Sequence, residues 1–190
     1  MRLFLAVGPS DAARAQLGDV LNRARDHVEE VADAMRWTEI ENIHLTLHFL
    51  GEVGDERAAA LQQALGDRLP VRTFSMTTGA LGTFPERGPA RVVWLSVTEG
   101  VEPLLRVHEE LARRLAAGAF AAEDRALAAH LTLARVRNRE RHRTRQLGRL
   151  VREVRCDPIT WRVDRVTLFR SHPSSSAPRY EPVQHIGLER

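Results

Sequence analysis

The tetrapeptide His-Leu-Thr-Leu occurs twice in this chain, at residues 44–47 and again at residues 130–133. Each copy alternates polar and apolar residues with the period of two that is typical of a half-buried β-strand. On such a strand the histidine and the threonine point to one face, and the two leucines point to the other. Two strands of this kind lining one cleft would bring two imidazoles and two hydroxyls around a shared point.

The chemistry that suits this set is acid–base catalysis on a phosphate, with His44, Thr46, His130 and Thr132 as the candidate catalytic residues. A single His-x-Thr pair on a strand is more often structural, as a surface pair or a satisfied core histidine. The repetition favours function, because only eight histidines occur and two of them open identical tetrapeptides. Packing alone would preserve the leucines and would not preserve the polar pair.

The elements around the two motifs follow the same order in both halves of the chain: strand, helix, motif strand, helix, strand. In the first half, hydrophobic periodicity and turn residues predict these elements at residues 2–7, 11–31, 43–50, 56–66 and 74–81, with a short extended piece at 36–38. In the second half they are predicted at residues 91–97, 101–117, 129–136, 139–152 and 159–169, followed by an edge strand at 179–186.

This order predicts an α+β fold with two pseudo-symmetric lobes, each a mostly antiparallel sheet with helices on its outside. The lobes are expected to span roughly residues 1–90 and 91–190 of a single domain, with exchange of strands between them left open. The two motif strands are expected to face each other across a central cleft.

Length and composition set further bounds on the class of protein. With 190 residues, 43% hydrophobic and 28% charged, the chain can bury an adequate core. Its apolar runs fall short of the ~18 residues that a membrane span needs, and its amino terminus is typical of a first strand rather than a signal peptide. Cys156 is the only cysteine, which excludes an intrachain disulfide and a cysteine metal cluster. We therefore expect a cytoplasmic protein.

All 28 basic residues are arginines, and the chain has no lysine. This excludes mechanisms that depend on a lysyl-adenylate, a Schiff base or a phosphate-binding-loop lysine. Arginine suits bidentate contacts with phosphate, although biased genome composition is the preferred explanation of the usage. The spacing of four between His44 and His48 suggests a metal pair, but no third ligand is evident, so we predict no metal site.

The doubled motif, in this order of elements, resembles the two-histidine (2H) phosphoesterase superfamily. More closely, the chain is similar to the RNA 2′,3′-cyclic phosphodiesterases, a family also named 2′-5′ RNA ligases. The resemblance covers nearly the whole chain and includes residues 2–7, 42–53, 82–85, 91–95, 130–136 and 163–171. One departure is Ala128-Ala129 before the second motif, where the family usually has an arginine and a proline nearby. This departure is expected to alter one side of the substrate entrance.

The resemblance implies hydrolysis of a terminal 2′,3′-cyclic phosphate to a 2′-phosphate, without a metal or another cofactor. It makes His44 the proton donor and His130 the acceptor, a division that the sequence alone does not decide. Thr46 and Thr132 would donate hydrogen bonds to the phosphate oxygens, where charge grows in the transition state. The implied partner is RNA with 2′,3′-cyclic phosphate ends, tRNA fragments among them, bound by a monomer away from any membrane.

The resemblance also assigns substrate binding to Arg135 and, less directly, to Phe49. Arg135 matches an arginine that helps to hold the phosphate, and Phe49 is a candidate for stacking on the terminal base. Each lies five residues after its motif histidine, so strict alternation would place both on the opposite face from the imidazoles. A β-bulge at the strand end would redirect them. For Phe49, packing in the core is the alternative.

Three alternatives stay open at the level of sequence. The first is ATP-independent, reversible 2′-5′ joining of RNA ends, since the missing lysine excludes only the adenylating kind of ligase. The second is a module that binds RNA ends without turnover, which the two intact histidines argue against. The third concerns a run of basic residues that is either a solvated face or a track for the RNA backbone: Arg135, Arg137, Arg139, Arg141, Arg143, Arg145, Arg149, Arg152 and Arg155.

Overall fold

The computed structural model describes residues 1–121, 126–174 and 177–190, and it contains two five-stranded sheets. The first sheet has the strand order β3 (Leu45–Glu52), β1 (Arg2–Val7), β9 (Arg165–His172), β10 (Arg179–Glu189) and β4 (Arg68–Arg72). The second has the order β2 (Met35–Trp37), β7 (His130–Val136), β6 (Val92–Glu99), β5 (Phe74–Phe84) and β8 (Thr160–Val163). The pairing of β10 with β4 is parallel and the other pairings are antiparallel, which confirms the predicted α+β class.

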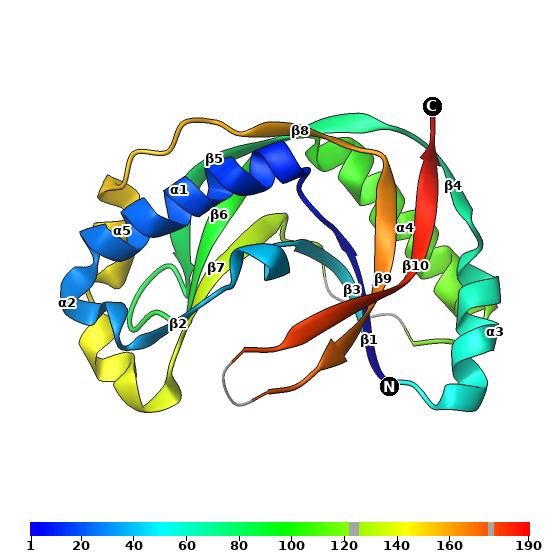
Figure 1. The fold of residues 1–190 in the computed structure, drawn as a ribbon, viewed down its shortest axis with the longest axis horizontal. Helices are drawn as coiled ribbons and strands as arrows, with labels where there is room; N and C mark the ends of the chain where they lie inside the picture. Colours follow the sequence, from blue (N-terminus) through cyan, green and yellow to red (C-terminus); the bar gives the residue numbers. More distant parts are fainter. Residues whose placement is uncertain (122–125, 175–176) are drawn as a thin grey trace.

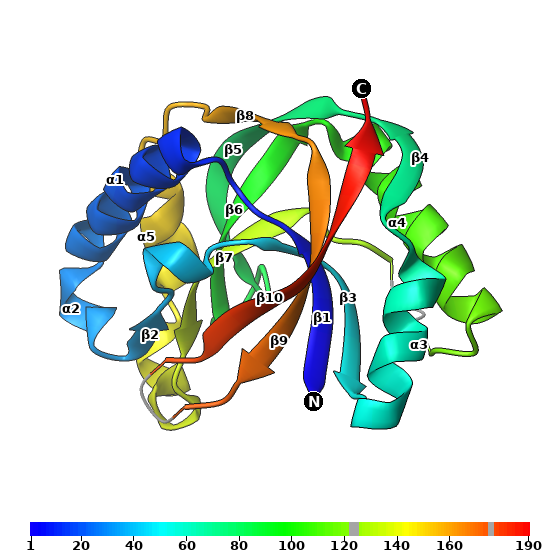
Figure 2. The same ribbon diagram turned by 45° about the vertical axis from the view of Figure 1, so that its right-hand side comes forward.

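Strands are exchanged between the two halves of the chain. The strands β2 and β5 come from the first ninety residues, yet both belong to the second sheet. Conversely, β9 and β10 come from the last thirty residues and complete the first sheet (Figures 1 and 2). The sheets therefore do not divide near residue 90. The exchange has a simple reason, because β1 is buried along almost its whole length and needs a neighbouring strand on both sides.

The helices cover the outer faces of the two sheets. In both ribbon views, α1 (Asp11–His27), α2 (Glu29–Ala32) and α5 (Leu147–Glu153) lie beside the second sheet, and α3 (Asp55–Leu65) and α4 (Val101–Ala117) lie beside the first. Ser10 caps α1 by accepting a hydrogen bond from the Ala13 amide at 3.2 Å. Within the described residues, no helix is both long enough and apolar enough to cross a membrane.

Several predicted elements differ from the observed ones. The predicted edge strand at 179–186 is β10, which lies inside the first sheet between β9 and β4. The predicted strand at 159–169 is interrupted at Asp164 and forms β8 and β9, one in each sheet. The predicted basic helix at 139–152 is a 3-10 helix, η2 (Asn138–Thr144), followed by the short helix α5. Sequence periodicity carries no information on which sheet a strand joins, and β4 was not predicted at all.

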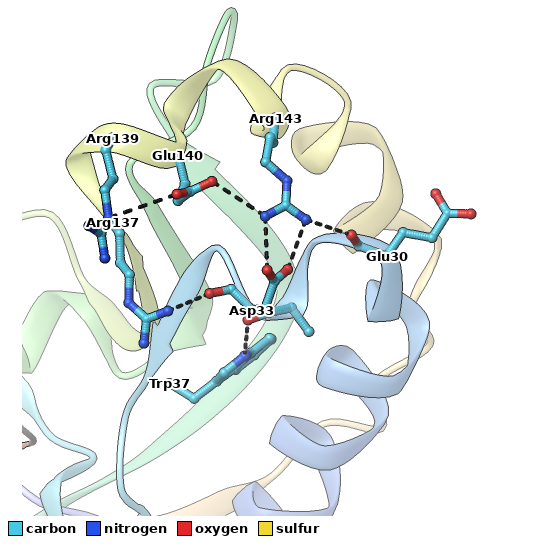
Figure 3. A network of polar contacts seen from close by, with 8 residues as sticks. Glu30, Asp33, Trp37, Arg137, Arg139, Glu140 and Arg143 are labelled. Carbon is cyan, nitrogen blue, oxygen red and sulfur yellow. Dashed lines mark hydrogen bonds and ion pairs between the residues drawn. The ribbon is translucent and has the colours of Figure 1, made fainter.

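A polar network fastens η2 to the turn that precedes β2 (Figure 3). The Arg143 guanidinium donates to both Asp33 carboxylate oxygens at 2.9 Å, and it also donates to the Glu30 carbonyl at 3.1 Å. Arg137 donates to the Asp33 carbonyl at 2.5 Å, and the Trp37 indole donates to the Ala32 carbonyl at 3.2 Å. Two members of the basic run thus hold β2 in place, while the side chain of Arg141 lies outside the described part of the chain.

Candidate active site

Both copies of the tetrapeptide line one cleft between the sheets, with a volume of about 490 Å³. His44 and Thr46 enter it from the first sheet, and His130 and Thr132 enter it from the second. His44 directly precedes β3 and follows the 3-10 helix η1 (Ile40–Asn42). The structure therefore brings the four predicted catalytic residues together, from positions 86 residues apart in the chain.

The two imidazoles are held by the same local contact. Nδ1 of His44 lies 2.7 Å from the Asn42 carbonyl oxygen, and Nδ1 of His130 lies 2.7 Å from the Ala128 carbonyl oxygen. Since a carbonyl only accepts, each Nδ1 carries the proton, and in the neutral ring Nε2 keeps a lone pair. For His44, Nε2 lies 3.1 Å from the Thr46 hydroxyl, which donates to it. Each histidine is thus oriented by the carbonyl two residues before it.

His44 is enclosed by aromatic rings, and this enclosure changes its protonation. The rings of Phe4, Phe169 and Tyr180 have centroids 4.9, 6.4 and 5.2 Å from the imidazole. Burial among them lowers the pKa of His44 to about 4, and the nearby positive charges, that of Arg135 first, also lower it. The hydrogen bond to the Asn42 carbonyl opposes this change. His44 is therefore a neutral imidazole at neutral pH in the free protein.

A β-bulge in each motif strand shifts the alternation by one residue. In the pairing of β1 with β3, Ala6 faces Thr46 and Leu5 faces His48, so Leu47 is the extra residue. In the pairing of β6 with β7, Leu133 is extra in the same way, between the partners of Trp94 and Val93. The two bulges fall at equivalent positions of the two tetrapeptides, each at the last leucine.

The bulges decide which later side chains reach the cleft. Phe49 is 46% exposed and lines the cleft, and the exposed side chain of Arg135 lines it too. The bulges therefore explain why both side chains reach the cleft, although strict alternation would place them on the opposite face. His48 turns the other way, is fully buried and stacks on His108 of α4 with ring centroids 4.0 Å apart. No group of three metal-binding side chains occurs among the described residues.

The cleft contains residues that the sequence patterns did not single out. Arg2, Arg36, Asn42 and Tyr180 all line it. Arg36 on β2 is the cross-strand partner of Arg135 on β7, which puts two arginines side by side. No periodic signal marks these residues. Arg2, Arg36 and Tyr180 come from strands that join the site through sheet pairing, and Asn42 ends η1 two residues before His44.

A second arm of about 640 Å³ adjoins the first. It shares Thr46, His130 and Arg135 with the first arm and is bounded by Phe84, Arg91 and Leu127, among others. Ala128, where the sequence departs from the family, lines this arm, so the departure does lie at one side of the cleft.

Positive charge dominates both arms. The lining residues of the two arms include Arg2, Arg36, Arg91 and Arg135, and within the described part of the chain they include no aspartate or glutamate. Like charges on facing strands destabilise the empty site unless an anion lies between them. The cleft thus suits a ligand with negative charge, placed between the two imidazoles and the two hydroxyls.

Comparison with known proteins agrees with this geometry. The model of the 2′-5′ RNA ligase superfamily matches residues 9–174. An RNA 2′,3′-cyclic phosphodiesterase from Thermotoga maritima is 28% identical over 190 residues, which cover 100% of this chain and 96% of the relative. One from Archaeoglobus fulgidus is 34% identical over 139 residues, or 73% of this chain and 74% of the relative.

Solved structures share the fold over the full chain. The crystal structure of E. coli LigT complexed with 3′-AMP superimposes with a TM-score of 0.75 at 25% identity, covering 100% of this chain and 98% of the other. A protein from Thermus thermophilus gives a TM-score of 0.72 at 26% identity, covering 98% and 97%. From the paired motifs, the two-sheet cleft and these matches, it follows that the chain belongs to the 2′-5′ RNA ligase superfamily, within the 2H phosphoesterases.

Proposed function

We propose that the protein is a hydrolase that converts RNA 2′,3′-cyclic phosphodiester ends to 2′-phosphomonoesters, by acid–base catalysis with two histidines and no metal. The observation that carries this proposal is the duplicated imidazole: His44 and His130 share one tautomer and one cleft. The names of the curated relatives point to the same substrate class. The absence of carboxylates among the described lining residues suits a phosphodiester.

In the proposed step, water attacks phosphorus on the face opposite the 3′ oxygen. One imidazole takes the proton from the water, the bond between phosphorus and O3′ breaks, and the other imidazole gives a proton to O3′. The phosphate stays on O2′, so the product is a 2′-phosphomonoester. Thr46, Thr132 and Arg135 would bind the non-bridging oxygens, and Phe49 would stack on the terminal base, since all four line the cleft.

The division of labour between the histidines meets an electrostatic constraint. The family resemblance makes His44 the proton donor, yet its pKa of about 4 leaves it neutral in the free protein at pH 7. For His44 to donate, the bound phosphate must first raise its pKa, as an anion near an imidazole does. If His44 instead accepts the proton of the attacking water, it is already in the neutral state that this role needs before substrate binds. The two assignments predict different responses to the leaving group.

The experiment compares wild type, His44→Ala and His130→Ala on an RNA ending in a 2′,3′-cyclic phosphate, with and without chelator. Each substitution should slow turnover by about 10²–10⁴-fold, and the double variant should be much less than multiplicatively worse. EDTA should have no effect. On a p-nitrophenyl phosphodiester, whose leaving group needs no proton, only the variant that lacks the acceptor should stay slow.

Near wild-type turnover in either single variant would show that the repeat is structural. Activity that EDTA abolishes and a divalent ion restores would exclude the metal-free step. Binding of the RNA end without any turnover by wild type would identify a binding module instead.

A second activity, reversible 2′-5′ joining of RNA ends, is favoured by the second arm of the cleft. A 5′-hydroxyl in place of water would attack the same phosphorus and break the same P–O3′ bond, and the arm bounded by Phe84 and Arg91 has room for that nucleoside. In a mixture of cyclic-phosphate and 5′-hydroxyl RNAs, Arg91→Gln should therefore lower joining more than hydrolysis. Equal losses would show that the arm serves both reactions alike.

A further inference from the structure

The two catalytic imidazoles each meet the edge of one aromatic ring in nearly the same geometry. The Tyr180 ring lies 5.2 Å from the His44 ring at an interplanar angle of 86°, and the Phe84 ring lies 5.2 Å from the His130 ring at 84°. Edge-to-face pairs of this kind fix the relative orientation of two rings. Each imidazole is therefore oriented by two contacts, the aromatic edge and the carbonyl that accepts from its Nδ1.

The surroundings of the two histidines differ beyond this point. Tyr180 belongs to β10, the strand that the carboxyl-terminal part of the chain adds to the first sheet beside β9. The Asn42 side-chain amide donates to the Pro178 carbonyl at 2.8 Å, and the Asn42 main-chain carbonyl accepts from His44. Asn42 therefore joins the histidine to the segment that carries Tyr180. At the second motif the corresponding residue is Ala128, which has no side-chain donor.

We propose that Tyr180 is a positioning residue for His44, seated by the hydrogen bond between Asn42 and Pro178, and that it fixes the rotation of the imidazole and keeps water from its face. His44 is thereby enclosed between Tyr180 and Phe4. The two histidines differ in the support of this contact, because Asn42 donates to Pro178 whereas the corresponding Ala128 has no side-chain donor. The catalytic meaning of the contact rests on the proposed function, whereas the contact itself is a property of the free protein.

The charges around this pair are those of Arg14 on α1, and of Arg135 and His130 on β7, which act on His44. Arg135 and Arg2 act on Tyr180, whose pKa is nevertheless raised because burial disfavours the phenolate. Tyr180 therefore stays a neutral phenol and acts on His44 through the shape and burial of its ring. It follows that a phenylalanine at this position should serve almost as well.

The first test is an NMR titration of the His44 imidazole in the free protein. Tyr180→Phe should leave the titration close to wild type, whereas Tyr180→Ala should admit water and raise the midpoint by about one pH unit. Asn42→Ala should move it in the same direction by less. Phe84→Ala is the matched control, because it removes the equivalent ring from His130 and should leave the His44 titration in place. Tyr180 is the only tyrosine of the chain, so its ring contacts to His44 can be assigned without ambiguity.

The second test is the kinetics of the same variants on a cyclic-phosphate RNA end. Tyr180→Ala should lower kcat by about 10–10²-fold with little change in KM, because a misplaced imidazole costs rate rather than binding. Its pH–rate profile should shift on the limb that His44 sets, and Tyr180→Phe should restore both. Thermal unfolding of each variant identifies any that fail to fold. If Tyr180→Ala does not fold, Asn42→Ala, which keeps the Tyr180 ring, provides the test.

Three outcomes overturn the proposal. An unmoved His44 titration in both Tyr180→Ala and Asn42→Ala would show that neither the ring nor the hydrogen bond to Pro178 positions the imidazole. A rise in KM with kcat and the pH profile unchanged would make Tyr180 a substrate contact. If Tyr180→Phe changed the His44 titration and kcat as much as Tyr180→Ala does, the role would belong to the hydroxyl. If wild type has no turnover on the RNA end, the proposed function fails while the titration still decides the contact.

Discussion

At the scale of single residues, His44 and His130 take the same tautomer because each donates Nδ1–H to the carbonyl two residues earlier. This contact is local in sequence, so it repeats wherever the tetrapeptide repeats. The enclosure of His44 by Phe4, Phe169 and Tyr180 is not local, and it is the main cause of the lowered pKa of about 4. Two identical motifs therefore carry imidazoles with different aromatic surroundings.

The lowered pKa of His44 predicts a loss of stability in acid. Its ordinary pKa is 6.5 and its pKa in the folded protein is about 4, so below pH 6.5 the unfolded chain binds a proton that the folded chain still excludes. The free energy of unfolding should therefore be full above pH 6.5 and fall as the pH drops towards 4. His44→Leu removes this contribution and should lose about 1–3 kcal/mol less than wild type between pH 7 and pH 4. Denaturant unfolding at the two pH values measures the difference, and equal losses would contradict the assignment.

At the scale of elements, the bulges in β3 and β7 place the residues that follow the motifs. Each bulge moves one position into the cleft that simple alternation assigns to the core, Phe49 in one strand and Arg135 in the other. Behind the second motif, Trp94 on β6 packs on Phe84, and both rings approach His130. The sheet supports the site through this aromatic packing.

Gly82 on β5 leaves the space that the Trp94 ring occupies. A Cβ atom at Gly82 would approach the indole carbons more closely than real Cβ atoms do, and the indole nitrogen is buried with no hydrogen-bond partner among the described residues to hold the ring elsewhere. Gly82→Ala should therefore push Trp94 towards His130, lower stability by about 1–3 kcal/mol, and lower kcat by about tenfold or more.

Gly18→Ala in α1 is the matched control for Gly82→Ala. An added Cβ there meets only Ile40 at 3.8 Å, an ordinary contact, and the helix gains from alanine. This variant should be as stable as wild type or more stable, with unchanged kcat. Thermal unfolding and steady-state kinetics report both quantities. A Gly82→Ala protein that matched wild type in both would show that Trp94 does not support the site.

At the scale of the whole molecule, two sheets that exchange strands enclose a cleft whose described charged residues are arginines. Outside the cleft, four of the arginines that follow β7 fall into two groups. Arg137 and Arg143 hold η2 against the turn before β2, as the network of Figure 3 shows. Arg145 and Arg149 are exposed on the segment that follows. Of these two groups, the second is the one available to an RNA backbone.

Replacing Arg145 and Arg149 together with glutamine should weaken binding of long single-stranded RNA. The slope of log affinity against log salt should fall by about 1.4, since each phosphate contact on a single strand contributes about 0.7. Turnover of a cyclic mononucleotide should barely change. Arg143→Gln is the control, because it should lower stability without changing the salt slope. Equal losses on both substrates in the double variant would mean that the segment supports the fold.

Local sequence patterns were enough to predict the features that depend on residues close together in the chain. The repeated His-x-Thr pair predicted which four side chains meet, and hydrophobic periodicity predicted α4 at residues 101–117 as observed. These predictions hold because helix and strand periods, and the carbonyl contact of each imidazole, depend on neighbours within a few residues. The assignment of roles to the four residues stays a prediction that the variants will test.

The other features of the site depend on how the strands pair in the folded chain. Only strand pairing created the bulges that turn Arg135 and Phe49 into the cleft, since a bulge is a property of two strands and not of one. Only sheet topology placed β10, predicted as an edge, beside β9, and so brought Tyr180 to His44 across 136 residues of sequence. The physical reason is that pairing satisfies backbone hydrogen bonds and apolar burial over the whole chain at once, and no local pattern contains that condition.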